Sequence, residues 1–359
     1  MSDRFATRHS KALLASTAAL ALTITTLATA PAAYAEPRPT TVIATGLDNP
    51  RQLSIGPGDR IYVAEAGRGG DGACTTGAEG TVCFGHSGAI TEINGKRQSR
   101  VLTGLPSVAN QDGSGAQGPA DVDVRGANVA ILFGLGLTSE QRTGLGPDAA
   151  TLGTIQTGRL RTAELTTAAD LAAWERDQNP DGLEEHSNPT GFLARDSSNW
   201  AVADAGANAV LGAGKRGSST IAVFPANRGH QSVPTDVVKG PDGAYYVSEL
   251  TGVPFPKGAS VIWRVVPGEQ PTEYATGLTN VTSLAFKGNQ LYAVQLADNG
   301  LFAGPTGSVR KVSAGGNSHD AVVDGLFAPF GIAIRGNDAY VTTGAMVPGA
   351  GQVQHIALR

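Results

Sequence analysis

The hydrophobic and polar positions of this chain follow one pattern that recurs about six times. Each copy has a short apolar run, then Gly, Asp or Asn turn residues, then a second apolar run, as in PRQLSI at 50–55 and IYVAE at 61–65. Short apolar runs joined by such turns predict β-hairpins. The first runs begin at Pro50, Pro119, Pro189, Pro234, Val281 and Pro329. The pattern therefore predicts a repeat architecture.

The spacing of the copies indicates which repeat architecture this is. Successive copies start 69, 70, 45, 47 and 48 residues apart, and a unit of about 40–50 residues with four short strands is typical of a β-propeller blade. Third strands are expected at 88–93, 158–165, 219–225, 260–266, 307–313 and 351–358. Fourth strands are expected at 100–105, 273–278 and 321–326. We predict an all-β fold, a six-bladed propeller with four-stranded blades.

The two ends of the repeat region predict how the ring closes. The last copy has only three strands, while the run at 41–47 has a fourth-strand pattern with no blade before it. Pairing the two would remove exposed sheet edges. We expect the N-terminal strand to complete the last blade.

The two long copies contain insertions. Residues 133–158 are rich in Gly and Thr, and we expect them to be irregular. The segment TTAADLAAWERD at 166–177 has a Thr cap and is followed by an Asn-Pro-Asp-Gly stop at 179–182. It predicts one short helix in an inter-blade insertion, docked on the second blade.

The first 35 residues have the pattern of a secretory signal. Arg4, Arg8 and Lys11 precede an apolar run over about 12–30, and Ala-Tyr-Ala at 33–35 fits a cleavage site. The alternative is a retained membrane anchor. We predict that residues 1–35 are removed and that 36–359 form the propeller, secreted to the extracellular space or the periplasm.

Two cysteines, Cys74 and Cys83, lie in the Gly-rich insertion at 67–88. In an exported protein, two cysteines in one loop predict a disulfide. Two free thiols or a metal pair are the alternatives, although the spacing is poor for zinc. A disulfide here would hold a loop that has little core of its own.

Charge argues against some partners. The whole chain has 27 basic and 31 acidic residues, and loss of residues 1–35 leaves 24 and 30, a formal charge of −6. A mildly acidic surface does not favour nucleic acid. No segment after the N-terminal run is apolar enough to span a bilayer. We expect a monomer with no nucleic-acid partner and no membrane insertion.

Several motifs resemble one family of exported propellers. They are YVAEAGRGG at 62–70, NPDG at 179–182, SNPTG at 187–191, VADAGAN at 202–208 and TIAVFP at 220–225. With these motifs the chain resembles the ScyD/ScyE family, which is related to NHL-type repeats. The resemblance covers essentially the whole mature chain. It implies the propeller fold and export, and it supplies no catalytic set to carry over.

The long connections predict where a site would lie. In each copy the turn between the first and the second strand is tight, whereas the connection that leaves the second strand is long. These long connections lie at about 66–87, 134–157, 205–218, 250–259, 296–306 and 343–350. One face of the disc should therefore carry most of the loops, and loops on a rigid scaffold commonly bind ligands. Polar residues at strand ends on that face are candidate ligand-binding residues: Glu65, Asp121, Asp204, Asp236, Glu249 and Gln295.

Glu65, Asp204 and Glu249 share one register at the ends of second strands, so they are also candidate metal ligands. Calcium is the one cofactor that this pattern suggests. The alternative is structural, because a carboxylate at a recurrent strand end can cap backbone amides of a turn. In that case the acids bind no ligand.

Two function classes follow. The first is a non-enzymatic binding or scaffold protein whose loop-rich face takes a small molecule, a glycan or a protein. The second is a calcium-dependent lactonase or esterase, in which an axial metal polarises an ester carbonyl. The sequence has no HExxH, GxSxG, P-loop or EF-hand loop, and it places no histidine as a base near the acids. The binding class is therefore preferred over an enzyme.

Overall fold

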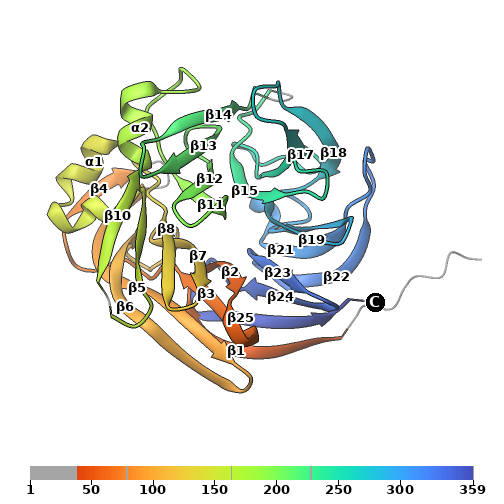
Figure 1. Cartoon of the computed structure of the whole chain (residues 1–359), viewed down its shortest axis with the longest axis horizontal. Helices are drawn as coiled ribbons and strands as arrows, with labels where there is room; N and C mark the ends of the chain where they lie inside the picture. Colours follow the sequence, from red (N-terminus) through yellow and green to blue (C-terminus); the bar gives the residue numbers. More distant parts are fainter. Residues whose placement is uncertain (1–38, 78–79, 163, 227–228, 359) are drawn as a thin grey trace, which may run out of the picture. The chain divides into compact units, whose positions relative to one another are not determined.

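The chain forms a ring of six antiparallel sheets, shown in a computed structural model that describes residues 39–77, 80–162, 164–226 and 229–358 (Figure 1). The predicted signal at 1–35 lies outside the described residues. Within blades one to five the four main strands follow one another in sequence order from the centre of the ring outward, and in the sixth blade the N-terminal strand is outermost. The predicted all-β, six-bladed propeller is confirmed.

The first blade contains β2 (Pro50–Ile55), β3 (Ile61–Glu65), β5 (Gly80–Asn94) and β6 (Arg97–Asn110), and β4 (Cys74–Gly77) pairs with the first part of β5. The second contains β7 (Pro119–Arg125), β8 (Asn128–Phe133), β9 (Thr154–Arg159) and β10 (Leu165–Asp170). The third contains β11 (Pro189–Ala194), β12 (Asn199–Asp204), β13 (Ala209–Gly214) and β14 (Ser219–Val223).

The fourth blade contains β15 (Pro234–Lys239), β16 (Tyr245–Glu249), β17 (Ser260–Val265) and β18 (Thr272–Leu278). The fifth contains β19 (Val281–Lys287), β20 (Gln290–Gln295), β21 (Thr306–Lys311) and β22 (Asp320–Phe327). The sixth contains β23 (Ile332–Arg335), β24 (Asp338–Thr343), β25 (Pro348–Ala357) and β1 (Thr40–Asp48).

The ring closes through the strand that the sequence left without a blade. β1 pairs antiparallel with β25, from Thr40 opposite Ile356 to Asp48 opposite Pro348, and the two strands lie side by side in Figure 1. The predicted completion of the last blade by the N-terminal strand is confirmed. Apolar side chains fill the spaces between neighbouring sheets, as in the cluster that joins Tyr62 and Ile90 of blade one to Ile131 of blade two.

Two of the expected third strands were wrong. The segment 158–165 covers the turn between β9 and β10, and 219–225 holds the outer strand β14, while the third strand of blade three is β13. Every residue of β13 (AVLGAG) is buried, so it lacks the alternation of apolar and polar residues that identifies a half-exposed strand. The expected long connection at 205–218 therefore contains a strand, Ala209–Gly214.

The helix content also differs from the prediction. Helix α2 spans Leu171–Gln178 and is capped by Asp170, whereas the preceding residues form β10, which completes blade two. Pairing with β9 overrides the helix propensity of the alanines there. The insertion at 133–158 is not irregular, because it contains helix α1 (Ser139–Gly144), with a capping box from Thr138 and Gln141, and the short 3-10 helix η2 (Pro147–Thr151). The described part of the chain thus has two α-helices rather than one.

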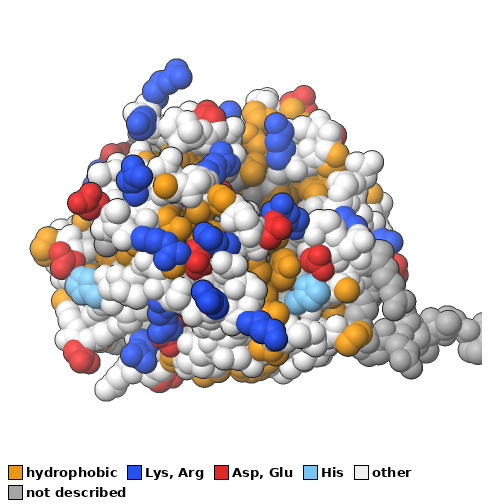
Figure 2. All heavy atoms as spheres, turned by 60° about the horizontal axis from the view of Figure 1, so that its bottom comes forward, with side chains coloured by type: hydrophobic (Ala, Val, Ile, Leu, Met, Phe, Trp, Pro, Cys, Tyr) orange, Lys and Arg blue, Asp and Glu red, His pale blue; other side chains and the backbone are white. Residues whose placement is uncertain are grey.

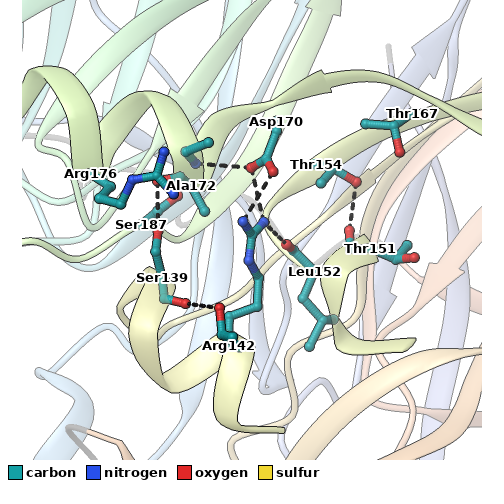
Figure 3. Close-up of polar contacts among 12 residues, drawn as sticks. Ser139, Arg142, Thr151, Leu152, Thr154, Thr167, Asp170, Ala172, Arg176 and Ser187 are labelled. Carbon is teal, nitrogen blue, oxygen red and sulfur yellow. Dashed lines mark hydrogen bonds and ion pairs between the residues drawn. The ribbon is translucent and has the colours of Figure 1, made fainter. Parts of the chain in front are cut away.

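An ion pair between a buried arginine and a half-buried aspartate joins these helices. Arg142 of α1 donates two hydrogen bonds to the carboxylate of Asp170, at 2.9 and 3.0 Å, and one to the carbonyl of Leu152 (Figure 3). Asp170 also accepts the backbone N–H of Ala173, and Ser139 donates to the carbonyl of Ala172. The insertion is therefore fixed to the outer part of blade two.

Candidate functional site

The innermost strand of each blade starts on the face that carries the long connections, which we call the loop-rich face. The second residue of each inner segment, directly after the recurrent Pro or Val, lines a single pocket at the ring axis. These residues are Arg51, Ala120, Thr190, Thr235, Thr282 and Phe330. Because all six blades contribute, the pocket is centred on the axis.

The threonines of this set connect one blade to the next. Thr235 donates to the carbonyl of Val281 at 2.7 Å, and Thr282 donates to the carbonyl of Phe330 at 2.7 Å. Arg51 donates to the carbonyls of Ala116 and Ala345 and lies over the ring of Phe330, 4.9 Å from its centroid. These side chains make the floor of the pocket a rigid, hydrogen-bonded layer.

Two of the candidate acids lie one residue further along the inner strands, below this floor. Asp121 accepts the backbone N–H of Phe192 in the next blade at 3.0 Å. Asp236 accepts the hydroxyl and backbone N–H donors of Ser283 and Leu284, both at 2.9 Å. Both carboxylates are buried. Their hydrogen bonds therefore join neighbouring blades around the axis.

Burial changes the acidity of these two groups. It raises the pKa of Asp236 to about 6. It raises the pKa of Asp121 well above its ordinary value, and the charge of Asp236 raises it further. At the same level, blades three and six have glycines, and a Cβ on Gly191 would lie 2.8 Å from an oxygen of Asp236. The axis is thus closely packed below the pocket.

The candidates at the ends of second strands perform a different task. Glu65 accepts the backbone N–H of Asp48 at 2.7 Å and binds Arg100 through both oxygens. Asp204 accepts four donors, among them the N–H of Asn188 at 2.6 Å. Gln295 accepts the N–H of Thr279 at 2.8 Å. In all three blades the side chain at the end of the second strand binds the segment that enters the inner strand. This agrees with the alternative that these side chains cap backbone amides and bind no ligand.

The three candidate metal ligands are not brought together. Glu249 accepts the indole N–H of Trp263 at 2.6 Å within its own blade, and Glu65 and Asp204 are held in theirs. In the described ranges, no group of three or more His, Cys, Asp or Glu side chains could hold a metal ion.

The pocket itself has a volume of about 740 Å³. Its wall over blades one to three is built from connected insertions. The disulfide between Cys74 and Cys83, predicted from the sequence, is present and holds the hairpin of β4 and β5. Gln141 of α1 donates to the carbonyl of Thr76 in that hairpin, and Glu185 accepts the N–H of Ser139. The disulfide loop, α1 and the segment before β11 therefore form one wall.

The floor residues were missed by the sequence analysis, although a signal for them existed. Each directly follows the recurrent residue that marks an inner strand, so the repeat itself points to them. The prediction chose acids because they carry chemistry, and most of those acids lie below or behind the pocket. Of the six candidates, none lines it.

The surface carries no field of a single sign on the side that Figure 2 shows. Basic, acidic and hydrophobic side chains are interspersed there. This agrees with the small net charge of the sequence.

Comparisons with known proteins support the fold. No family model matches the chain, and no curated protein matches it. Aldose sugar dehydrogenase from Escherichia coli has a TM-score of 0.55 at 14% identity, with 89% of this chain and 99% of that one covered. The calcium-binding protein regucalcin from Agrobacterium tumefaciens has a TM-score of 0.54 at 11% identity, with 90% and 94% covered.

A protein of unknown function from Bacteroides thetaiotaomicron has a TM-score of 0.52 at 9% identity, with 88% of this chain and 75% of that one covered. At such identities the likeness concerns the fold alone. This chain shares the β-propeller fold with these structures.

Proposed function

We propose that this chain is an exported, non-catalytic binding propeller of the ScyD/ScyE type, which holds a small molecule in the axial pocket. The observation that carries the proposal is the pocket of about 740 Å³, to which the inner segments of all six blades contribute. Small-molecule sites commonly have volumes of roughly 300–1,000 Å³ and combine apolar walls with a few polar groups.

Export is supported by two observations. The disulfide between Cys74 and Cys83 is of a kind that persists in oxidising compartments, and residues 1–35 have the pattern of a cleavable signal. No helix in the described part of the chain is long and apolar enough to cross a membrane. The family resemblance of the NPDG, SNPTG and VADAGAN motifs points in the same direction.

The calcium-dependent hydrolase is less well supported. It needs several oxygen ligands that converge on one ion. Glu65 is instead engaged by Arg100, and Asp204 by backbone donors. The residues present do not fit such an ion, so we derive no catalytic step through one.

The proposal can be tested with a variant whose pocket is blocked. Glu184 and Gln231 are exposed residues on the pocket wall, so the double variant Glu184→Trp/Gln231→Trp should fill the mouth without disturbing the core. The measurement is the melting temperature with a panel of uncharged sugars, glycosides, nucleosides and aromatic alcohols. A ligand at 100 times its Kd should stabilise the wild type by about 2.7 kcal/mol.

We expect at least one compound to stabilise the wild type and to lose this effect in the blocked variant. The matched control is Val42→Trp, which adds one indole on the outer strand β1, away from the pocket. It should retain the stabilisation. A panel in which no compound shows a pocket-dependent shift would contradict the proposed function.

A further inference from the structure

The two halves of the axial pocket differ in chemistry. Blades one to three and their connections contribute mainly amides and hydroxyls, whereas blades four to six contribute mainly apolar side chains. The polar half includes Asn110, Gln117, Thr138, Gln141 and Asn188. The apolar half includes Leu250, Val253, Phe255, Leu296, Leu301 and Met346. The pocket is therefore amphipathic across its width.

In the polar half, two side-chain amides have hydrogen-bonding atoms that the described part of the protein does not engage. The side chain of Gln117 has no hydrogen-bond partner among the described residues, and Asn188 uses only its oxygen, which accepts the N–H of Leu135. The two oxygens approach the same spot, since a Cβ added to Gly134 would lie 2.8 Å from Oε1 of Gln117 and 3.2 Å from Oδ1 of Asn188. Adjacent amides can both donate to and accept from hydroxyl groups.

In the apolar half, large side chains face solvent. Seven large hydrophobic residues are exposed in the described part of the chain, and of these Val253 and Met346 line the apolar half of the pocket. Val253 is 70% exposed and Phe302 is 74% exposed. Phe302 does not line the pocket itself but lies beside it, where it contacts the pocket residue Phe255 edge-on, with ring centroids 5.3 Å apart. Scattered exposed apolar residues are ordinary, but a group that borders one pocket marks a binding surface.

The charges around the pocket do not favour an ionic ligand. Arg51 already donates to two backbone carbonyls and stacks on Phe330. The wall also carries Asp181 and Glu184, and carboxylates repel an anion. Asp181 accepts from Asn208 and from the N–H of Leu183, which leaves it little capacity to bind a cation.

We propose that the axial pocket binds an uncharged amphipathic molecule, with a hydroxyl-bearing part against Gln117 and Asn188 and a planar apolar part against Val253, Phe255 and Phe302. An aryl glycoside is the simplest molecule of this class. This inference rests on the proposed function, since it specifies the ligand of the same pocket.

The test uses three probes that differ only in the apolar part, namely methyl, phenyl and 2-naphthyl β-D-glucoside. Binding to the purified protein is measured by isothermal titration calorimetry. We expect the affinity to rise along the series, by about tenfold or more from methyl to naphthyl, because the added ring area is buried against the apolar half.

Variants separate the two halves. Val253→Ser/Phe302→Ser should lower the affinity for the naphthyl glucoside by about tenfold, and it should change the affinity for the methyl glucoside by less than about twofold. The reason is that both residues are exposed and would contact only the apolar part of the ligand. Gln117→Met, a change of similar shape, should weaken all three probes by a similar factor. The control Val42→Ser removes an exposed valine from β1, outside the pocket, and should change nothing.

The outcomes distinguish this inference from the proposed function. Equal affinity along the series, or no effect of Val253→Ser/Phe302→Ser, would overturn the amphipathic ligand. If no glucoside binds but another panel compound is lost in Glu184→Trp/Gln231→Trp, the ligand class is wrong and the binding function stands. Undiminished glucoside binding by that blocked variant would overturn both. Melting curves of every variant show that it is folded.

Discussion

Glu175 should make the stability of this protein fall as the pH rises. It lies on α2, and its side chain is fully buried. Neither carboxylate oxygen makes a well-formed hydrogen bond in the described chain, although the backbone N–H of His186 lies near enough to lower the pKa of Glu175 slightly. Burial, together with the charges of Asp204 and Asp181, raises the pKa of Glu175 to about 8. The replacement Glu175→Gln keeps the shape and removes the titration.

The sign and size of the effect follow from proton linkage. Below a pH of about 4.5 the carboxyl is protonated in both the folded and the unfolded states, so Glu175→Gln should change little. Between about 4.5 and about 8 the unfolded state releases its proton while the folded state retains it. Over this interval the wild type loses up to about 1.4 kcal/mol per pH unit relative to the variant, with a ceiling of roughly 5 kcal/mol.

The assay is urea unfolding at pH 4.5, 6, 7, 8 and 9. We expect Glu175→Gln to match the wild type at the lowest pH, to become progressively more stable up to pH 8, and to keep a constant advantage above it. The control is Glu184→Gln, an equal change at an exposed position of the following segment, which should shift stability by less than about 0.5 kcal/mol throughout. A wild type that stays as stable as Glu175→Gln at pH 8 would refute the reasoning.

Three further predictions concern other parts of the fold. Val233 has a φ of 55°, and Asn280 occupies the same place in the next blade with a φ of 45°. Val233→Asn should therefore raise the free energy of unfolding, measured in urea, by about 1 kcal/mol. A loss of stability would count against backbone strain at this turn. Arg142→Met leaves the half-exposed Asp170 without its ion-pair partner and should cost roughly 1–3 kcal/mol. An unchanged unfolding midpoint would show that the helices dock without this pair. Because the described residues bring no group of acids together for an ion, calcium should leave the melting temperature unchanged, whereas a rise that a chelator reverses would restore the metal hypothesis.

The sequence alone determined the features that local patterns encode. A hairpin is specified by neighbouring residues, so the turns after PRQLSI and PTDVVK were enough to identify blades. The unpaired run at 41–47 predicted the closing strand, and two cysteines in one loop predicted the disulfide. Where the local pattern is ambiguous the prediction failed. The fully buried β13 has no alternation, and the residues of β10 have helix-forming alanines but pair with β9.

The site was decided by the closed ring. Gln52 donates to the carbonyl of Thr282, 230 positions away, and Arg51 reaches the carbonyl of Ala345, 294 positions away. No periodicity in the sequence reports such pairs, because they form only when the blades close into a ring. Strand-end acids such as Glu65 looked like ligands but accept backbone N–H groups of the segment that leads into their blade. The unlike halves of the pocket likewise belong to segments that are distant in sequence, and only the circular arrangement of the blades places them opposite one another.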